Sequence, residues 1–472
     1  MFVPPEQNAF VEYHLAIAEF QKIPQKEWPK YPDNPVGLHW RDYPDHAHDF
    51  IDKSQAAFEI WLAGTRKPRA AFLDPEEVKM RLGYKLGSTG YRLHSMAEQN
   101  GNIWRLRVLA QFGLWKALSL QDAGKLDEAW EWHFAVERTA LHLSMCGLFD
   151  HRLVGMGIKN VGSPYLHRWA EDPRVTAAQL QKCIAEIEKL NSQIPVPSHN
   201  LKTEYRCIRD PTRRFAYALY DLPSDRDSNL YLNPFSLVRR TIYKSKHYYS
   251  AVIGDYEIVS RLLKLQFQNW LSHVDLPSPE RRKLFKKFNS TSLFLDERSS
   301  GSKLTPDQID GLMAKCTLIS VVDPELESFL QAVDRDLARR GELEIMLALQ
   351  AHHRDQGCFP SELTLLIPKY LPQLPENPYS DEPGRPFLYR RESDHAVVWN
   401  IGEYEPVPPE KGPQYNPVNQ AQGSTIFWTT YPPGTHPPLY RPYPEGFEEA
   451  LEKKRQAEIE KSKRNPALLI GR

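Results

Sequence analysis

The sequence is short of the features by which secreted, metal-binding and membrane proteins are usually identified. Five cysteines occur in 472 residues, and no two form a Cys-x-x-Cys pair: Cys146, Cys183, Cys207, Cys316 and Cys358. This scatter argues against a zinc ribbon or a disulfide scaffold. No apolar run approaches the roughly 18 residues of a membrane-spanning helix, so we expect no membrane span in this chain.

The common signatures of catalytic sites are also missing. There is no Gly-x-Ser-x-Gly elbow, and His133 and His142 lack the glutamate of a His-Glu-x-x-His pair. The glycine-rich run 83–90 lacks the Gly-Lys-Ser/Thr ending of a phosphate loop and is expected to be a connection. The motifs therefore predict no catalytic, cofactor-binding or metal-binding residue, and they favour a protein that is not an enzyme.

The charges balance, since lysine plus arginine and aspartate plus glutamate each number 60. A net charge of zero gives no electrostatic reason to expect nucleic acid or anionic lipid as the main partner. Residues 1–5 contain no basic region followed by an apolar one, as a secretory leader would. If the chain start is genuine, we therefore expect a cytoplasmic protein.

Apolar residues at helical spacing are abundant from Ile103 onward. Trp104 and its apolar neighbours up to Leu118 leave little polar surface, which predicts a helix buried on most sides. A tight turn at Gly124 leads into a second helix over 126–141. This helical hairpin resembles one tetratricopeptide (TPR) unit, but no 34-residue repeat follows it.

Two further helices are predicted after this hairpin. The first, over 151–170, contains Gly155, Gly157 and Gly162, which are expected to allow close packing against a neighbouring helix. The second begins at the capping box 176–179, in which a threonine and a glutamine satisfy the free amides of the first turn.

A longer helix is predicted from Pro324 to Gln356. Asp323 suits the cap position, Pro324 suits the first helical position, and Gly357 suits the position just past the end. The apolar phase passes through Gly341, where we expect a bend. Runs of strand-forming residues at 387–390 and 396–399 then predict a β-hairpin, and 425–428 predicts one more strand.

The length of this helix predicts that it is shared between two parts of the protein. At ~1.5 Å per residue it spans about 50 Å, more than the small hairpin can cover. We expect its first half to pack on the helical body and its second half to pack under the hairpin. The residues concerned are Leu326, Phe329, Val333 and Leu337 in the first half, and Ile345 and Leu349, under Leu388 and Val398, in the second.

The same stretch resembles the soluble part of the major pseudopilin of type II secretion. That part has a helix ending in Tyr-x-x-x-x-Gly-x-Tyr-Pro, a leucine-rich segment, proline-containing turns and a hairpin. The matching residues here are 353–360, Leu363, Leu366, Pro378 and 389–390. The whole chain is similar to a set of uncharacterised bacterial proteins with a helical N-terminal body, and the resemblance implies a fold and says little about function.

Two departures limit what the resemblance implies. The only apolar run before the module is the short 318–322, so the pseudopilin's long apolar helix and its filament assembly are not carried over. After Gly402 no acidic, glycine-rich loop follows, so the calcium site is not carried over either. The resembling proteins usually begin with a membrane anchor. If an N-terminal segment is missing, the expected location becomes extracytoplasmic and membrane-anchored.

Together these patterns predict a mostly α protein, α+β overall, in five segments. They are N-terminal helices and irregular segments (1–100), a helical body (101–322), a pseudopilin-like α+β module (323–403), a Pro/Tyr-rich arm (404–444) and a charged C-terminal helix (445–472). The arm could be a ligand for a domain that grips extended proline segments, or it could lie on the protein's own surface. Its many aromatic residues favour the second alternative.

Two histidine-containing stretches invite a functional interpretation. His46 and His48, flanked by acidic residues, have the alternate spacing by which a strand would place two imidazoles on one side for a metal, although their surroundings are typical of a loop. The stretch 352–355 contains His-Arg-Asp, as in kinases, but no Gly-rich strand or Asp-Phe-Gly accompanies it. Polar residues of a last helical turn are the simpler interpretation.

The sequence therefore favours a non-catalytic scaffold or protein-interaction protein with an unidentified protein partner. By resemblance, a role in the cell envelope or in secretion is implied. The alternative is a metal-dependent hydrolase using His46 and His48.

Overall fold

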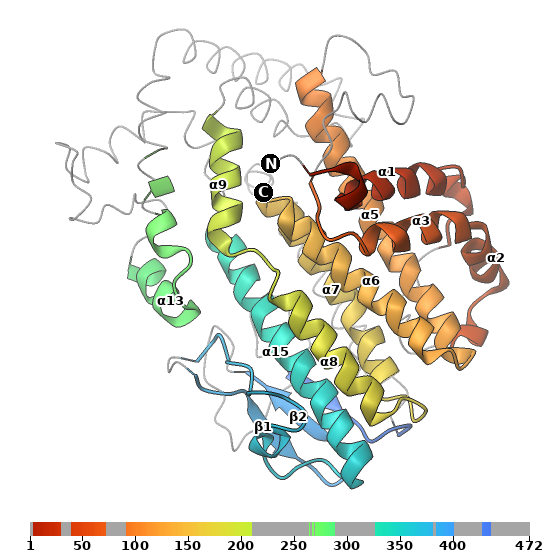
Figure 1. The fold of residues 1–472 in the computed structure, drawn as a ribbon, viewed down its shortest axis with the longest axis vertical. Helices are drawn as coiled ribbons and strands as arrows, with labels where there is room; N and C mark the ends of the chain where they lie inside the picture. Colours follow the sequence, from red (N-terminus) through yellow and green to blue (C-terminus); the bar gives the residue numbers. More distant parts are fainter. Residues whose placement is uncertain are drawn as a thin grey trace, which may run out of the picture.

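The computed structural model describes residues 3–29, 39–71, 91–209, 326–380, 384–400 and 427–435, together with 264, 267–268 and 270–287. These residues form a mostly helical protein with one small antiparallel sheet, which confirms the predicted fold class (Figure 1). The α-helices are α1 (Ala9–Phe20), α2 (Asp45–Lys53), α3 (Gln55–Thr65), α5 (Tyr91–Asp122), α6 (Leu126–Met145), α7 (Phe149–Ala170), α8 (Ala177–Asn191), α9 (Pro197–Arg209), α13 (Ser278–Lys287) and α15 (Leu326–Gln356). The 3-10 helices are η1 (Pro5–Gln7), η2 (Gln25–Glu27), η4 (Trp40–Asp42) and η6 (Leu363–Leu366), and the strands are β1 (Leu388–Arg391), β2 (Ala396–Trp399) and β3 (Phe427–Thr430).

The centre of the fold is a row of helices in which α5 packs on α6, α6 on α7, and α7 and α8 on α15. Figure 1 shows α6, α7, α8 and α15 running side by side. The turn between α5 and α6 has Gly124 at φ +78°, a backbone conformation that residues with a Cβ rarely adopt. The predicted capping box is present, with the Thr176 side chain accepting from the Gln179 amide and the Gln179 side chain accepting from the Thr176 amide.

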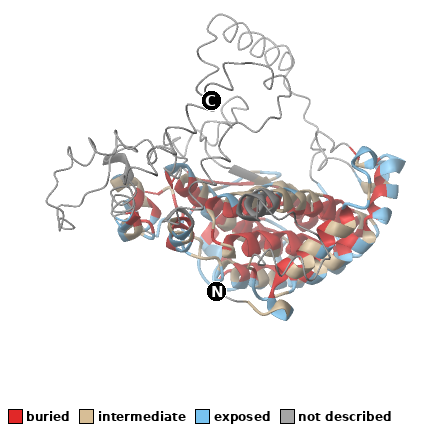
Figure 2. Ribbon diagram, turned by 90° about the horizontal axis from the view of Figure 1, so that it is seen from above, coloured by how far each residue is buried: buried red, intermediate tan, exposed pale blue. Residues whose placement is uncertain are grey.

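The helices α1 and α3 form a second layer that packs across α5 and α6. Its aromatic side chains enter the row of helices. Trp61 of α3 is fully buried against Gly113 of α5, where an added Cβ would come within 2.7 Å of the indole. Figure 2 shows the buried residues running through the interior of this arrangement. The apolar surface of the N-terminal helices therefore belongs to the same core as the helical body.

Helix α15 is shared between the helical body and the C-terminal module, as its length predicts. Near its start the Phe329 ring stacks on Phe149 of α7, with ring centroids 4.1 Å apart. Farther along, Gly341 lies against Phe387 and Pro375, and an added Cβ there would meet them at 2.8 and 2.9 Å. The chain stays α-helical through Gly341, whose absent side chain allows this close approach of the module.

Of the six α15 residues predicted to pack inward, five are buried and the sixth is partly covered. The buried residues are Leu326, Phe329, Val333, Ile345 and Leu349, and Leu337 is 37% exposed. One cluster of buried apolar residues extends from the N-terminal helices through the body to β2. The predicted boundaries at 100/101 and 322/323 stay predictions, and the described parts on both sides of each share this cluster.

The sheet has the strand order β1-β2-β3 and is antiparallel throughout. Tyr389 pairs with Val398 on one side of β2, and Val398 pairs with Trp428 on the other. All four residues of the central strand β2 are buried. The hairpin is present where it was predicted, and residues 427–428 of the strand predicted at 425–428 lie in β3, while 425–426 lie outside the described residues.

Several expectations concern residues outside those described. They are the loop 83–90, the cap Asp323, the parts of the arm before 427 and after 435, and the charged segment 445–472. In the ranges that are described, no helix combines the length and the apolar character that crossing a bilayer requires.

Candidate functional site

His46 and His48 lie on helix α2, so the expectation of a strand or loop at this pair is wrong. Residues two positions apart on an α-helix point to nearly opposite sides. His46 is exposed, whereas the His48 ring packs on Trp40 with ring centroids 4.4 Å apart. The Nε2 atom of His48 lies 3.1 Å from the carbonyl oxygen of Tyr43. This geometry does not direct the two imidazoles to one ion.

Side chains that bind metals are not grouped elsewhere in the described chain either. Throughout the described ranges, no group of three or more His, Cys, Asp and Glu side chains is arranged so that it could hold a metal ion. The polar clusters of the interior and the surface pocket remain as candidate sites.

The His-Arg-Asp stretch ends α15, and its arginine has a structural role. The Arg354 guanidinium donates to the carbonyl oxygens of Ala170, at 2.7 Å, of Asp172, at 2.8 Å, and of Val175. The last carbonyls of a helix have no partner within the helix, and a cation there also complements its dipole. Burial lowers the pKa of Arg354 to about 10, which still leaves it charged at neutral pH. Arg354, at the end of α15, thus caps the C-terminal end of α7.

The residues around Arg354 also hold strand β3 in place. Gln350 accepts from Arg354 at 2.6 Å, and its own amide donates to the Thr430 hydroxyl and to the Tyr431 carbonyl, both at 2.7 Å. The Glu171 carboxylate accepts from the Thr430 hydroxyl at 3.1 Å and from the Tyr431 amide at 3.0 Å. Burial raises the pKa of Glu171 to about 7, against the lowering effect of these hydrogen bonds. We call Glu171, Gln350, Arg354 and Thr430 the Arg354 cluster.

The described part of the Pro/Tyr-rich arm rests on this cluster. Beyond Tyr431, the Gly434 amide donates to the Glu171 carbonyl at 3.0 Å. An added Cβ at Gly434 would come within 3.4 Å of Pro173. Residues 427–435 therefore lie on the protein's own surface, the alternative that the aromatic content of the arm favours.

A second buried cluster joins α6, α7 and α15. Lys159 lies 3.1 Å from Glu137 and 3.6 Å from Asp336, and Arg340 lies 3.0 Å from Asp336. Each of these side chains is no more than 12% exposed. Burial alone would raise the pKa of Asp336, but Lys159 and Arg340 outweigh it and hold that pKa at about 2. The charges of this Asp336 cluster are matched by ion pairs within it.

A third polar centre joins α1 to α6. The Tyr13 hydroxyl lies 2.6 Å from Nδ1 of His142, and Nε2 of His142 lies 2.9 Å from the carbonyl oxygen of Lys67. A carbonyl only accepts, so Nε2 carries the proton and the Tyr13 hydroxyl donates to Nδ1. Burial lowers the pKa of His142 to about 4, and the ring is neutral. Tyr13 and His142 are buried to within 2% of full enclosure, so this pair has no access to a substrate.

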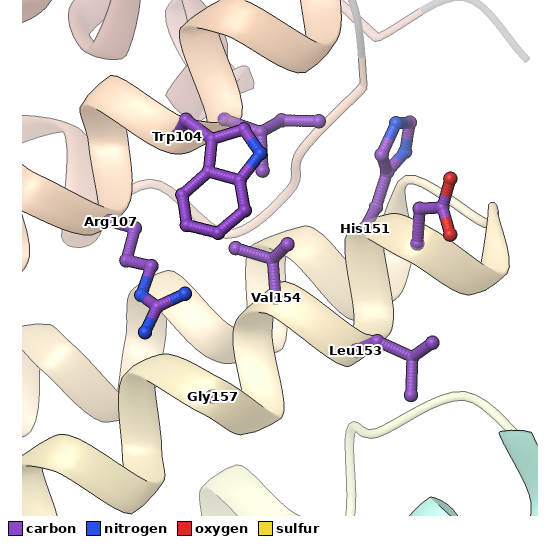
Figure 3. A pocket seen from close by; sticks show the side chains of 8 residues that line it. Trp104, Arg107, His151, Leu153, Val154 and Gly157 are labelled. Carbon is purple, nitrogen blue, oxygen red and sulfur yellow. The ribbon is translucent and has the colours of Figure 1, made fainter. Parts of the chain in front are cut away.

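The candidate binding site is a pocket of about 360 Å³ between α5 and α7. Trp104 of α5 is 56% exposed beside it, and the Arg107 guanidinium lies 4.8 Å from the centroid of the indole ring. Figure 3 shows Arg107 and His151 toward opposite ends, with Trp104 and Val154 between them. We call it the Trp104 pocket; its lining residues are Ile103, Trp104, Arg107, Asp150, His151, Leu153, Val154 and Gly157.

Two glycines of α7 explain why a hollow forms here. At Gly155 an added Cβ would come within 2.9 Å of the Ala140 carbonyl oxygen, so this glycine allows α7 to pack closely on α6, as predicted. At Gly157 an added Cβ would meet nothing within 4 Å. The expectation that Gly157 also serves close packing is therefore wrong, because this glycine faces the open space of the pocket.

The lining of the Trp104 pocket suits binding better than covalent chemistry. It combines an aromatic ring and aliphatic side chains with one cation, Arg107, and one exposed carboxylate, Asp150, and it contains no serine, threonine, cysteine or lysine nucleophile. His151 is 1% exposed, and burial lowers its pKa to about 3, so it is a neutral imidazole at physiological pH. General acid–base catalysis at neutral pH works best with a pKa near 7, which this group does not have.

The sequence did not reveal this site, because Trp104 was predicted to be buried with its apolar neighbours. The one available signal was the three-residue spacing of Trp104 and Arg107, which places both on one face of a helix. Which side of that face remains uncovered depends on the position of α7, and the sequence of α5 does not contain that information.

No family model, no curated protein and no solved structure matches the chain. The resemblances to the major pseudopilin and to a TPR unit gain no support from these comparisons and stay predictions.

Proposed function

We propose that this chain is a non-catalytic interaction protein whose helical body presents the Trp104 pocket to a protein partner. The observation that carries the proposal is the 56% exposure of Trp104 beside an open pocket, with Arg107 against its ring. Tryptophan and arginine are the residues most often responsible for binding energy at protein interfaces, particularly where they flank a pocket. A half-exposed tryptophan has an apolar surface that a partner can cover.

The interior of the protein supports a scaffold role. The charged groups with strongly shifted pKa values, such as Asp336, Glu171 and Arg354, lie in buried clusters that join helices to one another. Perturbed groups in a cleft point to catalysis, whereas the same groups in ion-pair networks commonly serve structure. Here these groups lie at the contacts of α15 with the body and the sheet.

The wider setting of the proposed function rests on sequence alone. A role in the cell envelope or in secretion follows only from the pseudopilin-like resemblance, and the compartment depends on whether an N-terminal segment precedes this chain. The balance of 60 basic and 60 acidic residues favours a protein partner over nucleic acid.

Capture of partners from native cells tests the proposal. Four baits are compared: the wild type, Trp104→Ala, Gly157→Trp, which fills the pocket, and Val196→Ala. Val196 is a matched control because it is an apolar residue with 57% exposure, close to the 56% of Trp104. We expect a partner captured equally by the wild type and Val196→Ala, and reduced about tenfold with the two pocket variants, the loss expected when a hot-spot residue is removed. Capture of the same proteins in equal amounts by all four baits would contradict the proposal.

A metal-dependent hydrolase using His46 and His48 is the alternative, and elemental analysis of purified protein separates the two. Stoichiometric zinc, manganese or iron that disappears in the His46→Ala/His48→Ala variant would replace the proposed function with this one. We expect the metal content of the two proteins to be equal and far below stoichiometric.

A further inference from the structure

We infer that the Trp104 pocket binds a large apolar side chain of a peptide segment and that Arg107 pairs with a carboxylate on a neighbouring residue of that segment. The inference rests on the proposed function and names the chemistry of the partner. It follows from three features of the site: its size, its apolar walls and its single cation.

The size of the pocket admits a large apolar side chain. Its volume of about 360 Å³ lies at the lower end of the range of roughly 300–1,000 Å³ for sites that enclose small molecules. Ile103, Leu153 and Val154 supply aliphatic walls, and the open space at Gly157 gives the hollow its depth. A leucine or phenylalanine side chain would remove these surfaces from water together with the exposed face of Trp104.

The charge of the site selects the neighbouring residue. Arg107 forms no ion pair with any of the described residues, although its guanidinium stacks on Trp104. The buried arginines are bound differently, since Arg354 donates to three carbonyl oxygens and Arg281 pairs with Asp334. A guanidinium held over a ring in this way presents its N–H donors in a fixed fork, which matches the two oxygens of a carboxylate.

A nucleotide is the competing ligand, because an aromatic ring and an arginine can also hold a base and a phosphate. The remaining lining argues against it. The pocket contains one cation, the neutral His151 at the end away from Arg107 adds no second positive charge, and the carboxylate of the adjacent Asp150 would repel a phosphodiester (Figure 3). Proteins that bind single strands use a positively charged groove along the backbone. The site therefore favours an acidic peptide.

Fluorescence polarisation with short labelled peptides and the full chain tests the inference. Each peptide carries one leucine or phenylalanine, with glutamate placed at successive positions on either side of it. The matched peptides replace that glutamate with glutamine or lysine, or the apolar residue with alanine. Adenosine monophosphate and an oligouridine are the nucleotide probes.

For the wild type, we expect the best glutamate peptide to bind about tenfold tighter than its lysine counterpart, a difference typical of one charge pair at an interface. The Arg107→Glu variant should reverse this preference. The Gly157→Trp variant should bind none of the peptides, and Val196→Ala should bind them as the wild type does. The reversal is decisive, because a protein that is merely damaged cannot gain affinity for the lysine peptide.

Three results would overturn the inference: equal affinity for the glutamate, glutamine and lysine peptides, no peptide binding at millimolar concentration, or tighter binding of a nucleotide probe. Each is distinguishable from failure of the proposed function. If Trp104→Ala and Gly157→Trp still lose the captured partner, the pocket is an interface and only its acidic specificity is wrong. If partner capture survives both variants, the proposed function itself fails.

Discussion

The two faces of helix α7 differ in whether the polar groups around them are paired. Toward α15, Lys159 lies within a cluster of ion pairs, and the carbonyls at the end of α7 accept from Arg354. Toward the N-terminal half of α5, His151 and its neighbours line a pocket whose one cation, Arg107, pairs with no acidic residue among those described. One face joins the protein together, and the other remains available to a ligand.

The contrast follows from the cost of burial. A charge that is removed from water must be paired. Removing one member of a buried pair leaves the other charge buried without a partner, which destabilises the folded state by several kcal/mol. Arg107 stays partly exposed to solvent, so the fold does not depend on a protein partner for its charge. Substitutions in the two regions should therefore differ sharply in their effect on stability.

The largest effect is expected in the Asp336 cluster. Asp336→Ala leaves Lys159 and Arg340 buried without their shared carboxylate and should lower the free energy of unfolding by about 3–5 kcal/mol. Arg107→Ala, the matched removal of one charge at the pocket, should change it by no more than about 0.5 kcal/mol. Urea unfolding measures both. A similar loss in the two variants would contradict the distinction between the faces.

The next effect concerns pH and the Arg354 cluster. The pKa of Glu171 is raised by burial from 4.5 to about 7, so the folded protein binds more protons than the unfolded chain between these values. Stability from this group is therefore complete below about pH 4.5 and is lost as the pH rises through 7. At pH 8, Glu171→Gln should be more stable than the wild type by up to about 3 kcal/mol, and the gap should narrow toward pH 5.

Comparing the two proteins at each pH removes the contribution of other groups. His142 and His151 have lowered pKa values and act in the opposite direction as the pH falls below their ordinary value of 6.5, but equally in both proteins. If the free energy of unfolding of the wild type and of Glu171→Gln changes in parallel from pH 5 to 8, burial does not raise the pKa of Glu171 in the folded protein.

Two glycines of α7 allow the packed face and the pocket face of this helix to be compared directly. Gly155→Ala pushes a methyl group toward the Ala140 carbonyl oxygen and should destabilise the protein by about 1–3 kcal/mol. Gly157→Ala meets open space, so the helix preference for alanine should stabilise the protein by about 0.5–1 kcal/mol. Thermal unfolding of the two variants checks the signs, and a loss of stability in both would mean that the pocket is closed.

The smallest effect is expected at His133 of α6. This side chain is 3% exposed, and neither ring nitrogen has a hydrogen-bond partner among the described residues. Burial lowers its pKa to about 3, so the protein carries a buried, neutral and unpaired ring. His133→Leu should raise the free energy of unfolding by about 0.5–1 kcal/mol at pH 8, and by more at pH 5, where the unfolded chain binds a proton at His133. A decrease at pH 8 would indicate a polar partner for the ring.

The sequence predicted what local chemistry determines. The capping box before α8, the glycine after α15 and the hairpin each depend on residues close together in the chain, and all three are present. The long helix α15 was predicted from its apolar phase. The helix at His46 was missed because the strand-like spacing of two histidines outweighed a proline just before the first turn.

The Trp104 pocket could not be predicted from the sequence, for a different reason. Apolar periodicity identifies the face of a helix that should be buried. How much of that face is covered depends on the helix packed against it, whose residues are distant in the sequence. Trp104 satisfies the pattern of a core residue and is nevertheless half exposed, because α7 presents Gly157 there and not a side chain. In the same way, Arg354 meets carbonyls that are about 180 residues away in the chain.

Partner capture by the Trp104→Ala variant, in a preparation whose unfolding free energy has been measured, tests most directly whether the fold and the binding surface are separate. We predict an unfolding free energy within about 1 kcal/mol of the wild type together with an about tenfold loss of the captured partner. Undiminished capture by a folded Trp104→Ala protein would contradict the assignment of the Trp104 pocket as the binding surface. A variant that unfolds would show that Trp104 belongs to the core after all.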